Sequence, residues 1–388
     1  MNRGAVKSED IQSSRAGRAI KLPQSYWAFA PAPLPPDLTY APSLIQLLTE
    51  AGHALGELAG LGRVVPNPHL LVTPAVRREA VLSSRIEGTR SDIEDLFLFE
   101  AAPEEPVDPD VREVHNYVVA LEYGIERLAT LPVSLRLVRE IHGRLMRSGA
   151  TAPGEFRNSQ NWIGPAGCTL NEAVFVPPPV HEMHTALADW EKYLHAPATA
   201  PALVRLALMH VQFEMIHPFL DGNGRVGRLL IVMLMCHWDL LPQPLLYLSA
   251  FFERHRYDYY RHLLRVSHHG EWEAWIEFFL RAVREQARDA VASGKALLDL
   301  QARYRTQLSG RRISKITGQL LDQLFINPIV TAPLVRDRWQ VNFRTAQKAI
   351  DNLVDLGILR EMTGRRRNRT WAAYEVLAIA SGKIGEQL

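Results

Sequence analysis

Apolar residues recur with the period of an α-helix along most of this 388-residue chain. The clearest stripe predicts a helix over residues 43–58 and comprises Leu44, Leu47, Leu48, Ala51, Leu55 and Leu58. The same period predicts helices over residues 110–128, 134–148, 180–195, 201–216 and 271–308. This pattern is typical of a mainly α fold, in which each helix buries one face against its neighbours.

Capping residues mark two more helices. Thr73 and Pro74 form an N-cap and a first-turn proline, so we expect a helix to begin there and to end near Gly88. Ser91 is followed three residues later by Glu94, which is the spacing of a capping box. The sequence therefore predicts a second helix start close behind the first helix.

One segment breaks the helical period. Residues 160–179 read QNWIGPAGCTLNEAVFVPPP, with β-prone runs at 161–163 and 174–176 around a turn rich in Gly, Pro and Asn. This order is typical of a β-hairpin. The sequence therefore predicts a hairpin within an otherwise helical domain.

Residues 217–228, which we call the catalytic loop, read HPFLDGNGRVGR and precede an apolar helical run at 229–235. Gly222 and Gly224 lack a Cβ atom, so the backbone can approach a ligand closely at these positions. Their amides, with that of Asn223, lie at the start of the next helix, where free N–H groups attract anions. The loop is therefore a candidate phosphate site.

Four charged or titratable side chains of the loop complete this site. Arg225 and Arg228 are three residues apart, so both can reach phosphate oxygens. Asp221 offers a hard oxygen ligand of the kind that Mg²⁺ prefers. His217 titrates near neutrality and can accept the proton of an incoming hydroxyl group. Together, the base, the metal ligand, the anion site and the cations indicate transfer of a phosphate-containing group.

The catalytic loop matches the Fic family signature HPFx(D/E)GNGRxxR at every defined position, so the chain resembles a Fic-type protein. The resemblance implies that His217 deprotonates a Ser, Thr or Tyr hydroxyl for in-line attack on the α-phosphate of ATP. It also implies that Asp221 holds Mg²⁺ between the α- and β-phosphates. The nucleotide-binding residues that it implies in the loop are Gly222, Asn223, Gly224, Arg225, Val226, Gly227 and Arg228.

Two further features bear on the choice of reaction. The common phosphate-binding loop GxxxxGK(S/T) is absent from the sequence. A relative that transfers a phosphate group has Lys at the position of Gly224, so the glycine in this chain favours AMP transfer over kinase activity.

The same resemblance gives roles to two segments outside the catalytic loop. The predicted hairpin, with Trp162, Ile163 and Gly164, lies where Fic proteins carry a flap that docks the target, although a plain surface hairpin is the alternative. Tyr259 and Tyr260 match a tyrosine pair that lines the nucleotide base pocket in relatives. Aromatic pairs on helices are also common in cores, so this alternative stays open as well.

Residues 83–88 read SSRIEG and fit the inhibitory motif (S/T)xxxE(G/N) of one class of Fic proteins. The motif begins at Ser83, and in that class its glutamate, here Glu87, pairs with the second arginine of the loop, here Arg228. The pair occupies the guanidinium that the γ-phosphate of ATP needs, and a ligand that competes for one partner releases it. The same glutamate could instead orient a water molecule that removes AMP, so the direction of the reaction stays open.

The C-terminal part is basic and has the order of a winged helix-turn-helix. Residues 301–375 contain 14 Lys and Arg against 6 Asp and Glu, whereas the whole chain has a net charge of only +2. The predicted order is helix 313–326, strand 328–331, helix 333–339, helix 343–356, basic tip 364–369 and an apolar segment 371–376. Expected DNA contacts are Arg344, Thr345, Gln347 and Lys348 of the third helix and Arg365, Arg366 and Arg367 of the tip. Winged helices also dock proteins or dimerise, which is the alternative use.

We therefore expect a Fic helical-bundle core with a β-hairpin flap, followed by a winged-helix domain. The expected regions are an extended, flexible lead-in (1–37), a Fic N-terminal region with the inhibitory helix (38–108), the Fic catalytic core (109–285), a helical linker (286–312) and the winged-helix domain (313–388).

The expected function is that of a protein adenylyltransferase (AMPylase), which uses ATP and Mg²⁺ to modify a target protein or itself. The alternatives are a DNA-binding regulator whose Fic core senses nucleotide, and a deAMPylase. Cys168 and Cys236 are the only cysteines, which excludes a disulfide framework and a cysteine-ligated zinc site and suits a cytoplasmic protein. The sequence shows no membrane-spanning apolar run and no signal peptide. A homodimer is expected only from the resemblance to the family.

Overall fold

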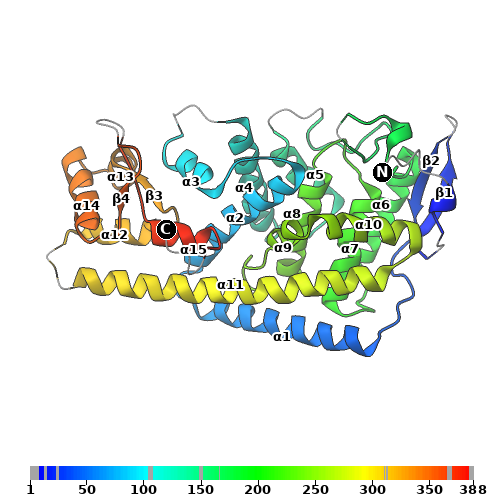
Figure 1. The fold of residues 1–388 in the computed structure, drawn as a ribbon, viewed down its shortest axis with the longest axis horizontal. Coiled ribbons are helices and arrows are strands. Elements are labelled where there is room, and N and C mark those ends of the chain that lie inside the picture. Colours follow the sequence, from blue (N-terminus) through cyan, green and yellow to red (C-terminus); the bar gives the residue numbers. More distant parts are fainter. Residues whose placement is uncertain are drawn as a thin grey trace.

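A computed structural model describes residues 8–12, 15–22, 26–103, 108–147, 152–165, 167–309, 311, 313–364 and 369–383. Figure 1 shows a mainly α-helical molecule, which confirms the expected fold class. Before the C-terminal module, the helices are α1 (Pro42–Val64), α2 (His69–Glu87), α3 (Ile93–Ala101), α4 (Pro109–Arg127), α5 (Leu135–Leu145), α6 (Val180–His195), α7 (Ala202–Ile216), α8 (Asn223–His237), α9 (Ser249–Arg254), α10 (Arg256–His269) and α11 (Trp272–Ser309), with 3₁₀ turns at Ser8–Asp10 and Leu170–Glu172. Among the described helices, none combines the length and apolar character needed to cross a membrane.

Helices α7 and α8 form the centre of the molecule. Both are buried around nearly their whole circumference, as is typical of helices that neighbours cover on all sides. They pack against each other, and α2, α4, α5, α6, α10 and α11 pack around them. Because α7 ends at Ile216 and α8 begins at Asn223, the first part of the catalytic loop is the connection between two buried helices.

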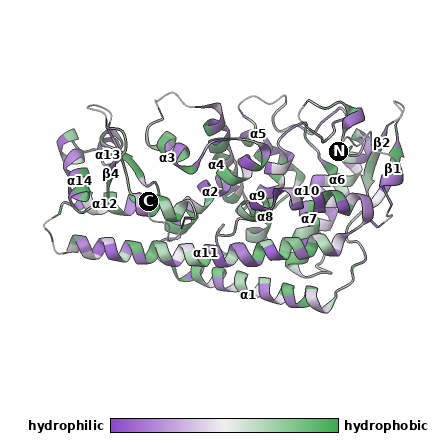
Figure 2. Ribbon diagram, in the orientation of Figure 1, coloured by the Kyte–Doolittle hydropathy of each residue, from purple (hydrophilic) through white to green (hydrophobic). Residues whose placement is uncertain are grey.

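The 38-residue helix α11 runs beside α1 along one side of the molecule (Figure 1). At a rise of about 1.5 Å per residue, it is about 57 Å long. Figure 2 shows polar and apolar residues alternating along it, as expected for a helix with one buried face. Residues of the expected helical linker (286–312) up to Ser309 continue α11 and bury Val291 and Leu297, in agreement with the helix predicted over residues 271–308.

Two strands form an antiparallel β-hairpin within the region that we expected to be an extended, flexible lead-in (1–37). Strand β1 (Gly17–Lys21) pairs with β2 (Trp27–Pro31) in the register Gly17 to Pro31 through Lys21 to Trp27. The hairpin is held because β2 buries Ala28 and Phe29 against the protein. The Phe29 amide also donates to the Val176 carbonyl at 2.9 Å.

The predicted flap hairpin is reduced to a single bridge. The chain turns back between residues 163 and 175, but antiparallel pairing is limited to Ile163 and Phe175, with the Ile163 amide donating to the Phe175 carbonyl at 2.8 Å. The expected strands do not extend further because Val176 pairs with β2 instead of with the facing flap residue.

Two predicted helix starts are shifted. Helix α2 begins at His69 and contains Pro74 in its interior, because the Asn67 side chain accepts from the His69 amide at 3.2 Å and starts the helix earlier than predicted. Helix α3 is capped by Asp92 with Asp95, one residue after the expected pair, since these carboxylates form the reciprocal capping box. The start and end of α6 agree with the predicted range.

The C-terminal module has the predicted winged-helix order. It consists of α12 (Lys315–Leu324), β3 (Ile329–Thr331), α13 (Ala332–Trp339), α14 (Phe343–Asp355), β4 (Arg360–Glu361), β5 (Thr370–Ala372) and α15 (Tyr374–Ala380), with strand order β3-β5-β4, all antiparallel. The last predicted segment divides into β5 and the short helix α15, which packs on α11 and α2. The Asn327 side chain donates to the Phe97 carbonyl of α3 at 3.1 Å and fixes the module to the rest of the chain.

Candidate active site

The catalytic loop is held in an unusual backbone conformation. His217 ends α7 with φ of 49°, which is uncommon for a residue other than glycine, and Gly222 precedes α8 with φ of 79°. The Asn223 side chain closes the loop, since its Oδ1 accepts from the Phe219 amide and its Nδ2 donates to the Phe219 carbonyl, both at 2.8 Å. The side chain of Asn223 is therefore structural, and only its amide remains for an anion.

Three side chains from other elements support the loop, and the sequence analysis missed their roles. The Arg157 guanidinium donates to the His217 carbonyl at 3.0 Å, and the Asn161 side chain donates to the Phe219 carbonyl at 2.8 Å. The His142 ring stacks on the Phe219 ring at 3.7 Å between centroids. Arg157 was visible in the segment PGEFR before the predicted flap, but nothing in the sequence linked it to residue 217.

His217 is arranged to act as a base. Its Nδ1 lies 3.3 Å from the carbonyl oxygen of Glu214, so a proton on Nδ1 leaves Nε2 as the acceptor. Burial is the largest influence on its pKa and lowers it to about 4. The imidazole is therefore neutral at pH 7 and ready to take a proton.

The neighbouring carboxyl of Glu214 does not add a negative charge to the site. Burial raises its pKa to about 8, so this group is mostly protonated at neutral pH. A Cβ atom at Gly227 would lie 2.3 Å from its Oε1, which explains the glycine at that position of the loop.

The carboxylate of Glu87 lies against the start of α8. A Cβ atom at Gly224 would be 2.3 Å from Glu87 Oε1 and 3.0 Å from Arg228 Nη1. The glycine thus allows both groups to approach the helix N-terminus, where the dipole favours negative charge. Glu87 occupies the position at which the sequence predicted a phosphate.

The expected contact between Glu87 and Arg228 is present. Arg228 Nη2 donates to Glu87 Oε1 at 2.6 Å, and the same guanidinium donates to the Ser83 hydroxyl at 2.8 Å and carbonyl at 2.9 Å. The Arg228 side chain is 1% exposed, whereas that of Glu87 is 33% exposed. A ligand can therefore reach the carboxylate more easily than the guanidinium.

Electrostatics keep both partners charged. Burial acts to raise the pKa of the Glu87 carboxyl, but the Arg228 guanidinium outweighs burial and the pKa is lowered. Burial acts to lower the pKa of Arg228, and the Glu87 carboxylate reverses this effect so that the pKa is raised. The pair is therefore an ion pair over the ordinary pH range.

The other loop arginine has a different partner. Arg225 is buried and donates to the carboxylate of Glu113, which projects from α4. Its Nη2 also lies 3.4 Å from the sulfur of Met146. Glu113 was absent from our predicted site, and no motif in the sequence marks it.

Asp221 fits the role of a Mg²⁺ ligand. Its side chain is 71% exposed and lies beside the anion site, with Oδ1 accepting from the Gly222 amide at 2.6 Å. No group of three or more His, Cys, Asp and Glu residues in the described part of the chain could hold a metal by itself. Mg²⁺ is commonly bound by one or two carboxylates together with substrate phosphates, and the exposed Asp221 carboxylate offers one such ligand.

The two tyrosines have different positions. Tyr259 is 1% exposed within an aromatic cluster, and its hydroxyl lies 2.9 Å from His210 Nε2, so it is part of the core. Tyr260 is 41% exposed, and its hydroxyl donates to the carbonyl of Ile86, next to Glu87, at 3.4 Å. Only Tyr260 is placed to contact a bound base.

The flap residues lie at the surface near the loop. Trp162 is 42% exposed, and its Nε1 donates to the Cys168 carbonyl at 3.0 Å, while Ile163 forms the single bridge. A Cβ atom at Gly164 would meet the Cys168 sulfur at 2.6 Å, so the turn is closely packed there.

The proposed DNA-reading helix is exposed. Arg344 and Lys348 project from α14 as exposed side chains, and the neighbouring Phe343 is 55% exposed. Arg365, Arg366 and Arg367 of the predicted basic tip lie outside the described residues.

Comparison with protein families matches three consecutive parts of the chain. Residues 45–126 match the family described as Fic/DOC family N-terminal, and residues 132–235 match the Fic/DOC family. Residues 317–373 match a family described as HTH DNA binding domain.

Relatives with curated names are similar at low identity. The chain is 24% identical over 182 residues to "Protein adenylyltransferase Fic" of Drosophila erecta, and 28% identical over 188 residues to the protein of the same name from Aedes aegypti. Each match covers 44% of this chain and 33% of the relative, so the matched part spans about a third of those proteins.

Solved structures share the fold. A Fic family protein from Desulfovibrio desulfuricans G20 aligns with a TM-score of 0.57 at 20% identity, over 88% of this chain and 98% of that one. A Fic domain containing signaling protein from Bacteroides thetaiotaomicron VPI-5482 aligns with a TM-score of 0.53 at 16% identity, over 64% of this chain and 96% of that one.

Proposed function

Because this chain belongs to the Fic/DOC family, we propose that it transfers AMP from ATP to a hydroxyl group of a target protein and that Glu87 restrains this activity. The observation that carries the proposal is the position of the Glu87 carboxylate, which contacts both Arg228 and the Gly224 backbone. A carboxylate at this place mimics a phosphate oxygen. The site is therefore built for an anion that Glu87 replaces when ATP is absent.

In the proposed reaction, His217 Nε2 takes the proton of the target hydroxyl. The hydroxyl oxygen then forms a bond to the α-phosphorus, the bond from that phosphorus to the β-phosphate oxygen breaks, and pyrophosphate leaves. The lowered pKa of His217 keeps the ring unprotonated at neutral pH, so Nε2 is free to accept the proton when the reaction begins. Mg²⁺ held by Asp221 would neutralise phosphate charge when bound.

The anion site would hold the phosphates through backbone and guanidinium groups. Glu87 lies against Gly224 in the first turn of α8, close to the free amides of the helix start, and Arg228 donates to it. A γ-phosphate needs the Arg228 nitrogen that Glu87 accepts from, so productive ATP binding and the ion pair exclude each other. Glu87 therefore lowers activity by competing with the substrate for one cation.

Mass spectrometry of the purified protein with ATP and Mg²⁺ tests this proposal. We would compare the wild type, Glu87→Gly and Glu87→Gly/His217→Ala, with a panel of lysate proteins as possible targets. The proposal expects AMP on the protein or on a target with Glu87→Gly, much less with the wild type, and none with the double variant. Equal labelling by all three proteins, or none by any of them, would overturn it.

The C-terminal module favours DNA binding as a second function. It matches the HTH DNA binding domain family, and α14 exposes Arg344 and Lys348. Anisotropy of a labelled duplex over a salt series tests this. Each variant that removes a phosphate contact, Arg344→Gln or Lys348→Gln, should reduce the salt slope by about 1. Lys295→Gln, an exposed change on α11, is the control. DNA binding that does not depend on salt or on Arg344 and Lys348 would exclude this function.

A further inference from the structure

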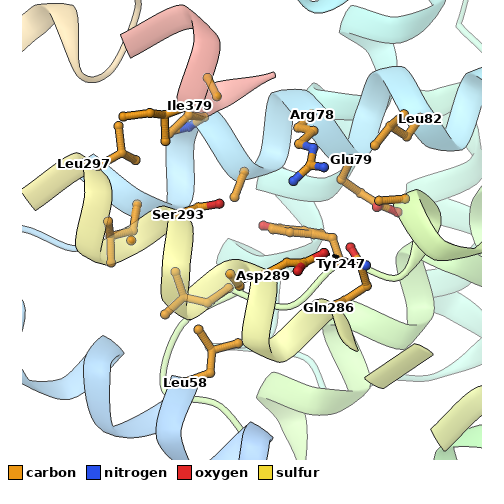
Figure 3. A pocket seen from close by; sticks show the side chains of 18 residues that line it. Leu58, Arg78, Glu79, Leu82, Tyr247, Gln286, Asp289, Ser293, Leu297 and Ile379 are labelled. Carbon is orange, nitrogen blue, oxygen red and sulfur yellow. Dashed lines mark hydrogen bonds between the residues drawn. The ribbon is translucent and has the colours of Figure 1, made fainter. Parts of the chain in front are cut away.

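A pocket whose lining contains no residue of the catalytic loop lies beside the inhibitory helix α2 (Figure 3). From α2 it is lined by Leu71, Ala75, Arg78 and Leu82, which recur every three or four residues and so share one face of the helix. Glu79 also lines the pocket and lies one and two turns before Ser83 and Glu87, which contact Arg228, so the pocket reaches the face of α2 that holds Arg228. Helix α11 and the C-terminal helix α15 complete the pocket, so it lies where three parts of the molecule meet.

The pocket contains a guanidinium without a partner. Within the described residues, Arg78 forms no hydrogen bond or ion pair, and its buried Nε is left unsatisfied. The adjacent Glu79 is hydrogen-bonded elsewhere, because its Oε1 accepts from the Tyr117 hydroxyl at 3.1 Å and the Ser249 hydroxyl at 2.5 Å, and its Oε2 accepts from the Ser249 amide at 3.3 Å. An unpaired, half-buried guanidinium is costly, and a carboxylate is the group that pairs with it best.

A carboxylate from α11 lines the same pocket but does not reach Arg78. Asp289 accepts from Gln286 Nε2 at 3.2 Å, and it lies on the exposed side of the pocket. Its charge acts on Arg78, but no ion pair within 4.0 Å joins these two described residues. The exposed Arg254 is a further charge near Arg78. The pocket therefore offers a positive and a negative group with a gap between them.

The remaining walls are aliphatic and the space is small. The cavity volume is about 70 Å³, roughly half that of the 150 Å³ cavity that takes up benzene in another protein. Its aliphatic lining includes Leu58, Leu71, Leu245, Leu297 and Ile379. The space suits a ligand of a few heavy atoms, partly seated in the open mouth.

We propose that this pocket binds a small aliphatic α-amino acid as its zwitterion. The ligand carboxylate pairs with Arg78, its ammonium group lies near Asp289, and its side chain contacts the leucines. A simple anion would satisfy Arg78 but lie close to Asp289, and a simple amine would leave Arg78 unpaired. A zwitterion carries its two charges on neighbouring atoms and fills the gap between the two side chains.

Binding would also affect the inhibitory contact, a consequence that rests on the proposed function. Leu82 lines the pocket and the next residue, Ser83, accepts from Arg228. The pocket exists in the arrangement in which Glu87 holds Arg228. A ligand that fits this arrangement stabilises it and strengthens the inhibition.

Calorimetry of the full-length protein with L-valine tests the binding site without any assay of transfer. Isovalerate lacks the ammonium group of valine, isobutylamine lacks the carboxylate and glycine lacks the side chain. We expect L-valine to bind and each analogue to bind about tenfold or more weakly. No heat with L-valine, or equal binding of isovalerate, would overturn the proposal. These ligand comparisons need no variant, so they stand even if a substitution impairs folding.

Variants locate the site. Arg78→Gln in α2 and Asp289→Asn in α11 should each weaken L-valine binding by about tenfold. Arg288→Gln and Asp299→Asn, which change exposed side chains of α11, should leave it unchanged. Unchanged binding by either pocket variant would exclude this site. If binding is found, L-valine should lower AMP transfer by the wild type and leave Glu87→Gly unaffected. If L-valine binds but does not lower AMP transfer by the wild type, or lowers it equally in Glu87→Gly, the link to inhibition is excluded and the binding site still stands.

Discussion

Two carboxylate–arginine pairs flank the start of α8, and they differ in what the carboxylate covers. Glu113 pairs with Arg225 from α4, and Glu87 pairs with Arg228 from the end of α2. Both arginines are buried, and both glutamates are about one third exposed, at 39% and 33%. The Glu87 carboxylate also lies against Gly224, where a Cβ atom would be 2.3 Å from its Oε1 and where we propose that a phosphate binds. The two ion pairs are similarly buried, so burial does not tell which of them blocks the site. The position of the carboxylate does.

The Gly224 contact gives the largest expected effect. In the Glu87→Gly background, Gly224→Ala should lower AMP transfer by about 100-fold, because a methyl group would fill the space for the phosphates. AMP incorporation and ATP affinity measure this change. Gly318→Ala, at a helical glycine with no atom close to its added Cβ, is the matched control. Full transfer by the Gly224→Ala variant would show that the phosphates bind elsewhere.

The two glutamates can be compared directly. Glu87→Gln should raise AMP transfer by about tenfold, which is within the usual range for one coupled contact. Glu113→Gln should change it by less than about threefold, since Glu113 pairs with Arg225 and not with the Arg228 that the γ-phosphate needs. Initial rates at limiting ATP measure both changes. Equal activation by both variants would mean that releasing either arginine is enough.

The pH profile separates the base from the inhibitory pair. With the pKa of His217 near 4, kcat/KM of Glu87→Gly should stay nearly constant from pH 7.5 to 5.5. An ordinary histidine, with a pKa of about 6.5, would lose about tenfold of its neutral form at pH 5.5. Removing Glu87 removes an influence that raises the pKa of His217, so the pKa stays low in this variant. A tenfold loss would show that the ring is solvated during catalysis.

The smallest effect is expected at Ser83. Ser83→Ala removes the hydroxyl that accepts from Arg228 Nε, and the buried donor left behind should lower the free energy of unfolding by about 1–3 kcal/mol. Ser84→Ala is a close control, because the buried Ser84 hydroxyl has no partner among the described residues and its loss should be nearly neutral. Urea denaturation compares the two. Equal loss in both variants would mean that the Ser83 bond adds nothing to stability.

Much of the fold could be predicted because helical periodicity is local. The bounds of α6 agree with the prediction, and α7, α11 and α14 begin or end within a residue or two of it. The β1–β2 hairpin was missed because its strands are short and owe their order to packing, with Phe29 bonded to the flap residue Val176. The same contact limited the predicted flap hairpin to one bridge.

The sequence by itself determined the contents of the catalytic loop, because His217, Asp221, Gly224 and Arg228 are contiguous and their spacing on a loop and helix is local. Only the tertiary structure decided which groups face them. Glu113 comes from α4, His142 from α5, and Arg157 and Asn161 from the loop between α5 and α6. Arg78 and Asp289 line one pocket because α2 packs on α11. Contacts between residues far apart in the chain depend on how helices pack, and packing has no local signature in the sequence.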